Sequence, residues 1–413
     1  MKRLAAWNKN FNRFVFFMAF PGIILFVNVS MYFFVGLFLI SRQRYSRLAR
    51  SIKTEIPFLA IFFGIGAAIS VLLVPSGWGG ENFRHALLAL PNYIYWVMLI
   101  VFLNRYRSIV DYNQVSKFVF YGVSFYLPFW FLSENYLEGI PLFQKTTPNN
   151  LAFLMIAYSP MAISYVSLTF SRNKAKLYFL AILLVMLFLG RRAGFVLVLI
   201  GGILTLFVKS FTFSSFLKYG LVFTLFWFVL QFSVFEEVIR VANPRVYQLV
   251  YDRDELVSED RSYLTRVAMI EKGIDLFNEY PFSGVGITNF HRTEGHIAGD
   301  FEGYELIRYK LNLNELSAHN SYVSVLSEGG LVLFAPWILI MLSILVRFSS
   351  NLSNIESKYY PLFWGCLGMF FHYTSIVGYV NVYSWFIIAM CGVVLSRIGE
   401  EHVNSLKPIN RAI

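Results

Sequence analysis

Hydrophobic residues in this chain gather in long runs that are separated by short polar segments. The runs lie at 14–40, 55–74, 84–103, 117–133, 151–170, 177–190, 193–208, 216–237, 321–346, 359–379 and 382–397. Most of them approach the roughly 20 apolar residues that a helix needs to cross a bilayer. The pattern therefore predicts an all-α polytopic membrane protein.

Basic residues at the ends of these runs predict which side of the membrane each loop faces. Lys and Arg are enriched in cytoplasmic loops, and they flank the first run on both sides, within 2–13 and 42–53. The run 14–40 must therefore enter and return, as a pair of short or tilted helices interrupted at Pro21. When the run 14–40 is counted as two crossings, the pattern predicts about twelve crossings with both termini in the cytoplasm.

The composition agrees with a membrane protein. The chain of 413 residues is 57% hydrophobic and 14% charged, which is too apolar for a soluble domain. A net charge of +11 would suggest nucleic acid as a partner, but in a membrane protein the excess Lys and Arg belongs in cytoplasmic loops. The bilayer is thus the expected partner, and nucleic acid is not. The cysteines Cys366 and Cys391 both lie in apolar runs, so we expect neither a disulfide framework nor a cysteine metal site.

A single long polar segment, 238–320, divides the chain. It predicts an N-terminal transmembrane bundle at 1–237, a large outer loop at 238–320, and C-terminal transmembrane helices with a cytoplasmic tail at 321–413. A loop of roughly 80 residues is too long for a passive connection, and long ordered loops tend to carry function.

Part of this loop is expected to be helical. Apolar residues recur at three- and four-residue spacing at Val267, Ile270, Ile274 and Phe277, which predicts a helix over Thr265–Phe277. The segment 280–286 should end it in a turn. Gly284 and Gly286 permit positive φ there, and successive backbone N–H groups in such a turn can bind an anion.

Arginines on the outer face are the next candidates. Arg191 and Arg192 lie between two apolar runs where the chain turns outside, against the usual distribution of charge. They either reach lipid phosphate or form an anion site of guanidinium groups. Arg261 and Arg266 stand near the start of the loop helix and could join such a site.

The segment that enters the run 321–346 contains a candidate base. His319 ends the polar segment, and Asn320 or Ser321 can cap the helix that follows by accepting from its free N–H groups. Glu328 lies about two turns further in. Ionisable groups at such depths are costly and are functional candidates, although His319 could also be a simple capping and anchoring residue.

Together these residue types suit one chemistry. Guanidinium groups bind a diphosphate through paired, charge-assisted contacts and neutralise it as it departs. A neutral imidazole can remove a proton from a hydroxyl near pH 7. A membrane enzyme of this design would pass a glycan from a lipid-linked diphosphate to an acceptor hydroxyl, with the polyprenyl tail held in the apolar bundle.

Four segments then resemble, in order, motifs of the O-antigen ligase/polymerase superfamily of bacterial surface-polysaccharide enzymes. They are residues 190–195 (GRRAGF), Arg266, residues 280–290 (YPFSGVGITNF), and residues 319–322 (HNSY) with 328–331 (EGGL). The twelve-crossing plan with one large periplasmic loop also fits this family. The loop helix departs from the pattern, since Ile270 stands where many relatives have an aromatic residue.

The resemblance implies roles for particular residues. In this family two arginines are taken to hold undecaprenyl diphosphate and a histidine to act at the acceptor hydroxyl, without a metal or other cofactor. It therefore implies His319, Arg266 and Arg192 as catalytic residues, with Arg192 fitting the motif better than Arg191. Substrate contacts are expected from Arg191, Arg261, Gly284, Gly286, Asn320 and Glu328. The family also implies the bacterial inner membrane, with the active site facing the periplasm.

Three functions remain open on the sequence. The first is a ligase that moves a polysaccharide onto a lipid A-core acceptor, and the second is a polymerase that uses another lipid-linked repeat unit as acceptor. The third is a transporter, which is disfavoured because no repeat of broken helices relates the two halves and the polar groups crowd at one face. The sequence indicates neither the sugar nor the oligomeric state.

The other histidines are expected to be structural. His372 lies within an apolar run beside Phe371 and Tyr373, so we expect a hydrogen-bonded core residue. His291 and His296 are five positions apart, which does not suit two metal ligands on one helix.

Overall fold

The structure is a computed structural model. It describes residues 55–75, 79–105, 107–108, 110–136, 148–189, 192–208, 261–293, 318–351, 355–380 and 382–406, with isolated positions at 237, 240, 247 and 251. The predicted runs at 14–40 and 216–237 lie outside these residues, as do Arg191 and the rest of the loop. For Arg192 and Arg261 the backbone alone is described.

The described chain is helical throughout and contains no strand. Its helices are α4 (Glu55–Leu72), α5 (Gly79–Arg105), α6 (Tyr112–Tyr136), α7 (Pro148–Thr169), α8 (Arg172–Phe188), α9 (Arg192–Phe207), α14 (Arg261–Glu279), α16 (Ser321–Ser350), α17 (Tyr360–His372) and α18 (Val382–Leu406), with short 3₁₀ turns η3 (Phe290–Arg292) and η5 (Ser357–Tyr359). Every predicted apolar run within the described residues corresponds to one of these helices. The helix predicted over Thr265–Phe277 is confirmed and is longer, because α14 extends it at both ends.

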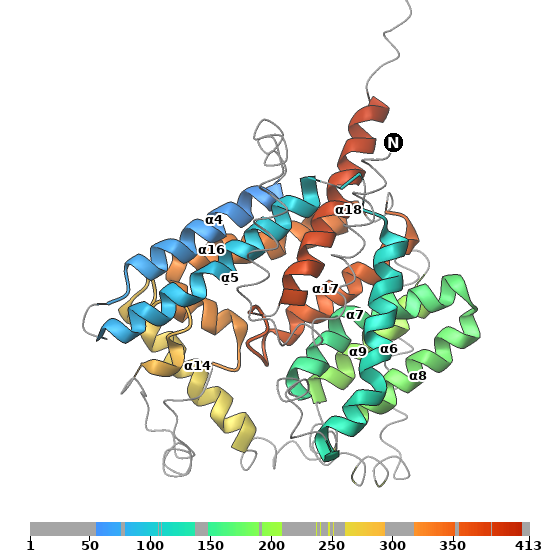
Figure 1. Ribbon diagram of the computed structural model, residues 1–413, viewed down its shortest axis with the longest axis horizontal. Coiled ribbons are helices and arrows are strands. Elements are labelled where there is room, and N and C mark those ends of the chain that lie inside the picture. The colour runs from blue at the N-terminus through green and yellow to red at the C-terminus, as the bar shows by residue number, and fades with distance from the viewer. Residues whose placement is uncertain are drawn as a thin grey trace, which may run out of the picture.

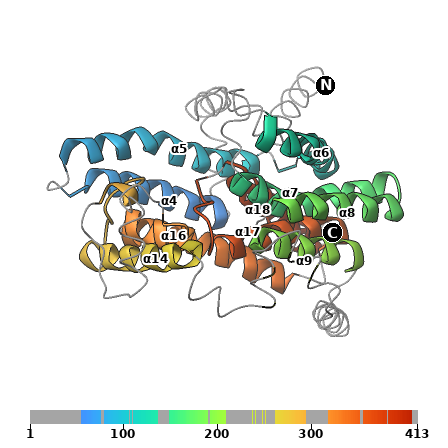
Figure 2. The same ribbon diagram turned by 90° about the horizontal axis from the view of Figure 1, so that it is seen from below.

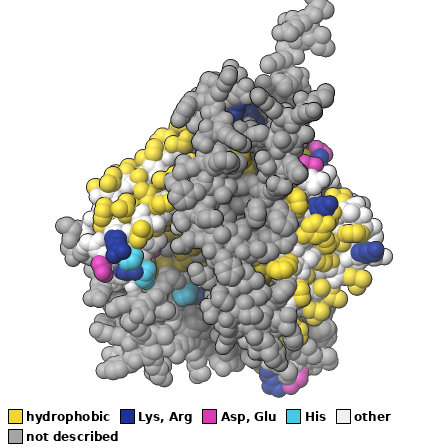
Figure 3. Space-filling model, viewed as in Figure 1, with side chains coloured by type: hydrophobic (Ala, Val, Ile, Leu, Met, Phe, Trp, Pro, Cys, Tyr) yellow, Lys and Arg dark blue, Asp and Glu magenta, His cyan; other side chains and the backbone are white. Residues whose placement is uncertain are grey.

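Four of the described helices are long and apolar enough to cross a membrane. They are Glu55–Leu72, Gly80–Arg105, Leu151–Thr169 and Ser321–Ser350. Large hydrophobic side chains are exposed along them, and Figure 3 shows hydrophobic side chains on the left and right flanks of the visible face. An apolar surface of this kind suits lipid contact. The count of about twelve crossings stays a prediction.

The C-terminal helices pack among the N-terminal ones. In Figure 1, α4, α5 and α16 lie together on one side, α6 to α9 lie on the other, and α17 and α18 lie between them. Figure 2 shows α14 alongside α16, in agreement with their contacts. The predicted segments 1–237 and 321–413 therefore contribute helices to one bundle.

Close backbone approach joins α4 to α16. A Cβ placed on Gly66 would lie 2.2 Å from the Val332 carbonyl oxygen, so only glycine fits there. Nearby, the Ser70 hydroxyl donates to the Glu328 carbonyl at 2.9 Å. This contact holds α4 against the part of α16 that carries the candidate site.

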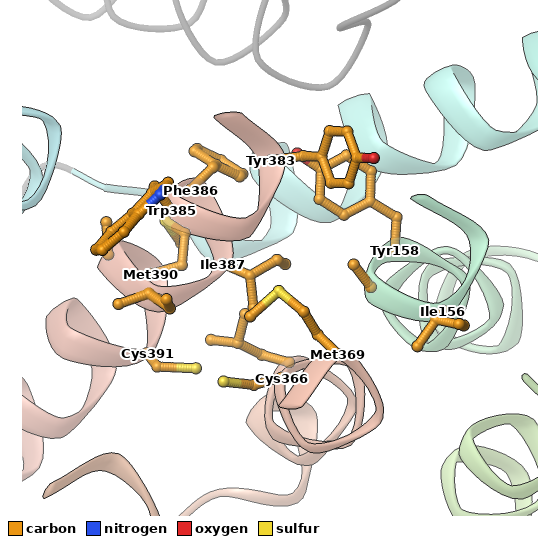
Figure 4. Packing of buried hydrophobic residues seen from close by; sticks show 14 of the residues in the cluster. Ile156, Tyr158, Cys366, Met369, Tyr383, Trp385, Phe386, Ile387, Met390 and Cys391 are labelled. Atoms are coloured by element: carbon orange, nitrogen blue, oxygen red, sulfur yellow. The ribbon is translucent and has the colours of Figure 1, made fainter. Parts of the chain in front are cut away.

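The core is aromatic and contains both cysteines. Trp96 of α5 stacks on Trp385 of α18, with ring centroids 5.2 Å apart. Figure 4 shows Cys366 and Cys391 pointing toward one another between α17 and α18, and both are buried free thiols.

Candidate active site

The candidate site is built on an interruption of α16. Gly330 has φ 56° and ψ −162°, a conformation that other residues essentially never adopt. The break turns several backbone groups of α16 away from helical partners, and the turn after α14 pairs with them. A Cβ on Gly330 would lie 2.3 Å from the Phe282 carbonyl oxygen. Glycine is therefore required by both conformation and space.

Four backbone hydrogen bonds dock the turn into this break. Val285 and Gly286 donate their N–H groups to the carbonyls of Ser327 and Glu328, each at 2.9 Å. In return, the N–H groups of Leu331 and Val332 donate to Pro281 at 2.9 Å and to Phe282 at 3.2 Å. The two sequence segments 280–290 and 328–331 thus form a single unit.

The predicted positive φ at the turn glycines is confirmed, but their expected part in anion binding is not what the geometry provides. Gly284 has φ 65° and Gly286 has φ 94°. The N–H group of Gly284 donates to the Tyr280 carbonyl at 3.0 Å, and those of Val285 and Gly286 donate to α16. Because these amides are engaged inside the protein, the glycines act here in docking the turn.

Glu328 connects three parts of the chain rather than facing an open site. Its side chain is only 5% exposed. One carboxylate oxygen accepts from the Phe290 N–H at 3.3 Å, and the other accepts from the Tyr379 hydroxyl at 2.7 Å. The Tyr379 hydroxyl also lies 3.1 Å from that of Tyr93. These contacts give Glu328 a structural role, and its predicted contact with substrate stays a prediction.

The start of α16 holds His319 in a special backbone conformation. His319 has φ 48°, in the left-handed region that few residues other than glycine occupy. Asn320 follows as the N-cap, and its side-chain oxygen accepts from the N–H groups of Tyr322 and Val323 at 2.9 and 3.1 Å. The predicted cap is confirmed, and this oxygen is used by the helix.

A second set of contacts fixes the start of α16 to the segment after α17. The Ser321 N–H donates to the Tyr373 carbonyl at 2.8 Å. The Ser321 hydroxyl donates to the Ile376 carbonyl at 2.6 Å and accepts from the Gly378 N–H at 2.8 Å. These bonds bring the residues before Ser321 and before Tyr373 to the same end of the bundle, so His319 and His372 belong to one region.

Arg266 reaches this region from α14. Its guanidinium interacts electrostatically with His372, the last residue of α17. His372 is 7% exposed, and its Nδ1 lies 2.9 Å from the Ser375 hydroxyl. Its ring stacks on Phe153 with centroids 5.7 Å apart. The structure therefore brings a guanidinium and two imidazoles to one end of α16 and α17.

His372 is the residue that sequence reasoning undervalued. The prediction of a buried, hydrogen-bonded histidine is confirmed, but its electrostatic interaction with Arg266 was not foreseen. Its place within an apolar run gave no signal of this, because the contact joins helices that are distant in the sequence.

The remaining predicted arginines are placed only by their backbones. Arg192 begins α9 and Arg261 begins α14. Since α9 contacts α17 and α14 contacts α16, both arginines lie on helices that border the site. Among the residues that the structure describes, no group of three His, Cys, Asp or Glu side chains could hold a metal ion.

Comparison with known proteins adds one finding. A family model described as O-antigen ligase matches residues 177–338. The match includes α9, α14, the docked turn and the first part of α16, and so includes Arg192, Arg266 and His319. No curated protein matches the chain.

Proposed function

The family match over residues 177–338 supports membership of the O-antigen ligase/polymerase superfamily, and we propose a specific reaction for this chain. The protein transfers a glycan from undecaprenyl diphosphate to a sugar hydroxyl at the periplasmic face of the inner membrane. The favoured acceptor is a lipid A-core, and the alternative is another lipid-linked repeat unit.

The convergence of Arg266 and His319 on one end of the bundle carries this proposal. His319 is held by the fixed start of α16. Arg266 approaches the end of α17, which is hydrogen bonded to that start. A proton acceptor and a fixed cation in one region are what glycosyl transfer from a diphosphate requires.

In the proposed mechanism, neutral His319 accepts the proton of the acceptor hydroxyl. The acceptor oxygen forms a bond to the anomeric carbon as the bond from that carbon to the diphosphate oxygen breaks, which inverts the configuration. Arg266 and Arg192 neutralise the departing diphosphate, with Arg191 and Arg261 as further cations on the same face. The proton on His319 then passes to solvent.

The lipid tail has a candidate groove beside this unit. An apolar groove of about 540 Å³ lies between α4 and α16, with Phe62, Ile65, Leu331 and Pro336 among its lining residues. Leu331 directly follows the glycine break, so the groove begins near the docked turn. An isoprenoid chain is apolar and fits such a lining.

The reaction can be tested with purified protein in liposomes and a lipid-linked oligosaccharide donor. Products would be sized with and without a lipid A-core acceptor. Product that forms only with the acceptor supports the ligase, and elongation from donor alone supports the polymerase. Absence of product in both cases, with binding of the lipid diphosphate intact, would contradict glycosyl transfer and favour transport.

A further inference from the structure

Lys272 is an unusual residue in the loop helix. It lies on the buried side of α14 with Ala268, Met269 and Leu276, and it is 0% exposed. Its ammonium nitrogen has no hydrogen-bond partner among the residues that the structure describes, and it lies 5.0 Å from the centre of the Phe290 ring. Burial of an ammonium without a partner is unfavourable, and a cation–π contact offsets only part of that cost.

Other basic groups act together with this lysine on His291. His291 and Arg292 follow Phe290 in η3, and His291 interacts electrostatically with Arg292, Lys272 and His85 of α5. The Arg292 Nε is buried and has no hydrogen-bond partner within the described ranges. Burial first, and then these neighbouring charges, lower the pKa of His291 below its usual value of 6.5. Basic groups from α5, α14 and η3 thus act on one another electrostatically.

The surrounding structure holds this arrangement in place. The Asn289 side-chain amide donates to the Asn82 carbonyl at 3.1 Å, which ties the start of α5 to the turn. Figure 3 shows cationic, histidine and acidic side chains together at the edge of the molecule where α5 begins. Asp275 lies one turn after Lys272, and within the described part of the chain its Oδ2 lacks a hydrogen-bond partner, so no hydrogen bond joins this oxygen to Lys272.

We propose that Lys272, His291 and Arg292 form a second anion site, which receives a phosphate or carboxylate group carried by a glycan substrate. Lys272 and Arg266 are six residues apart on α14, which corresponds to about 9 Å along the helix axis. The proposed site is therefore separate from Arg266. A diphosphate held at Arg266 would leave it free for a charged substituent of the sugar chain. The identification of the ligand as a glycan rests on the proposed function.

The chemistry favours a single compact anion. One buried ammonium beside an aromatic ring offers a small, desolvated position, where a charge-assisted hydrogen bond is strong. An extended polyanion would instead match a broad exposed basic surface. Sugar phosphates and sugar acids combine a compact anion with a ring that can lie against Phe290.

The test measures equilibrium binding to the full-length protein in detergent micelles. The probes are glucose 6-phosphate, glucuronate, inorganic phosphate and uncharged glucose. We expect the wild-type protein to bind at least one anionic sugar about tenfold or more tightly than glucose, and Lys272→Met to lose that preference. Arg84→Gln removes an exposed cation from the same end of α5 and should change affinity by less than about twofold.

Each alternative result has a definite meaning. Equal binding by wild type and Lys272→Met, or no binding of either charged sugar, would overturn the site. Inorganic phosphate that binds as tightly as glucose 6-phosphate would overturn the glycan as ligand and indicate a site for free phosphate.

Folding and turnover can be separated from this result. Lys272→Met removes a buried charge while keeping an unbranched side chain, so its thermal midpoint should equal or exceed that of the wild type. A lowered midpoint would assign Lys272 to stability and contradict the inference. Binding needs no glycosyl transfer, so an inactive transfer assay with intact sugar binding would refute only the proposed function.

Discussion

Glu328 provides a prediction that can be worked out bond by bond. Its carboxylate accepts from the Phe290 N–H and from the Tyr379 hydroxyl in a buried setting. Glu328→Ala leaves both donors without an acceptor. Hydrogen bonds to charged groups contribute about 1.5–3 kcal/mol each, so the free energy of unfolding should fall by about 3–6 kcal/mol.

Glu328→Gln should be much milder because the hydrogen-bond chain can reverse. The glutamine oxygen can still accept from Phe290, and its amide can donate to the Tyr379 oxygen. The Tyr379 hydroxyl would then donate to Tyr93, which is 3.1 Å away. Only the extra strength from the charge is lost, so we expect a cost of less than about 2 kcal/mol.

A double-mutant cycle tests this reversal directly. In the wild type, Tyr93→Phe removes one neutral hydrogen bond and should cost about 0.5–1.5 kcal/mol. In the Glu328→Gln background, the same change leaves the Tyr379 hydroxyl without an acceptor and should cost about 1–3 kcal/mol.

The measurement is the free energy of unfolding in mixed detergent micelles. It covers the wild type, the two single variants Glu328→Gln and Tyr93→Phe, the double variant, and Glu328→Ala. A coupling of about 1 kcal/mol is expected between the two changes. Additive effects, or a Glu328→Ala protein as stable as the wild type, would refute the assignment of Glu328 as a structural connection.

Three further predictions follow. Gly330→Ala should lower the free energy of unfolding by about 3 kcal/mol or more. The control Gly399→Ala, where an added Cβ meets nothing within 4 Å, should be neutral or mildly stabilising. Equal thermal midpoints for the two variants would contradict the break in α16. Burial lowers the pKa of Lys272 to about 8, so glucose 6-phosphate binding should weaken from pH 7 to pH 9 as the ammonium loses its proton. The free energy of unfolding, measured relative to Lys272→Met, should rise between pH 8 and 10 because the unfolded chain keeps that proton to a higher pH. Flat profiles of binding and stability against pH would contradict this. Arg266→Lys should reduce transfer by about tenfold or more because a point charge cannot make paired contacts, and full activity in a product-release assay would show that charge alone suffices.

The helices were predictable because membrane insertion imposes a simple rule on the sequence. A run of apolar residues must satisfy its backbone internally, so each run that falls within the described residues is a helix. The N-cap at Asn320 was predictable for a similar reason, since it depends on neighbours in the chain. Positive φ at Gly284 and Gly286 followed from residue type and the local turn.

The site itself depends on contacts that local patterns do not encode. Glu328 was expected to face substrate because it is ionisable and deep in the membrane region, yet its partners come from the turn and from Tyr379. The glycine turn was expected to hold an anion, yet its amides pair with α16. The break at Gly330 lies in a continuous apolar run and becomes intelligible only with the docked turn in place.

The proposed role of Lys272 was also not predictable from the sequence. Its neighbours on the helix, Ala268, Met269 and Leu276, form the buried face of α14, and the amphipathic pattern gives no reason for a lysine among them. Only the positions of Phe290, His291 and Arg292 around it suggest a role.

The proposed role of His319 as the proton acceptor can be tested by a single substitution. Its φ of 48° makes His319→Ala ambiguous, because alanine would be strained there. Asparagine tolerates this conformation but cannot take up a proton near neutral pH, so His319→Asn separates chemistry from backbone. The measurement is the rate of undecaprenyl diphosphate release from a lipid-linked glycan in the presence of acceptor, with thermal midpoints determined in parallel. We predict an unchanged midpoint and a loss of at least about a hundredfold in rate. Full activity in a correctly folded His319→Asn protein would contradict the account.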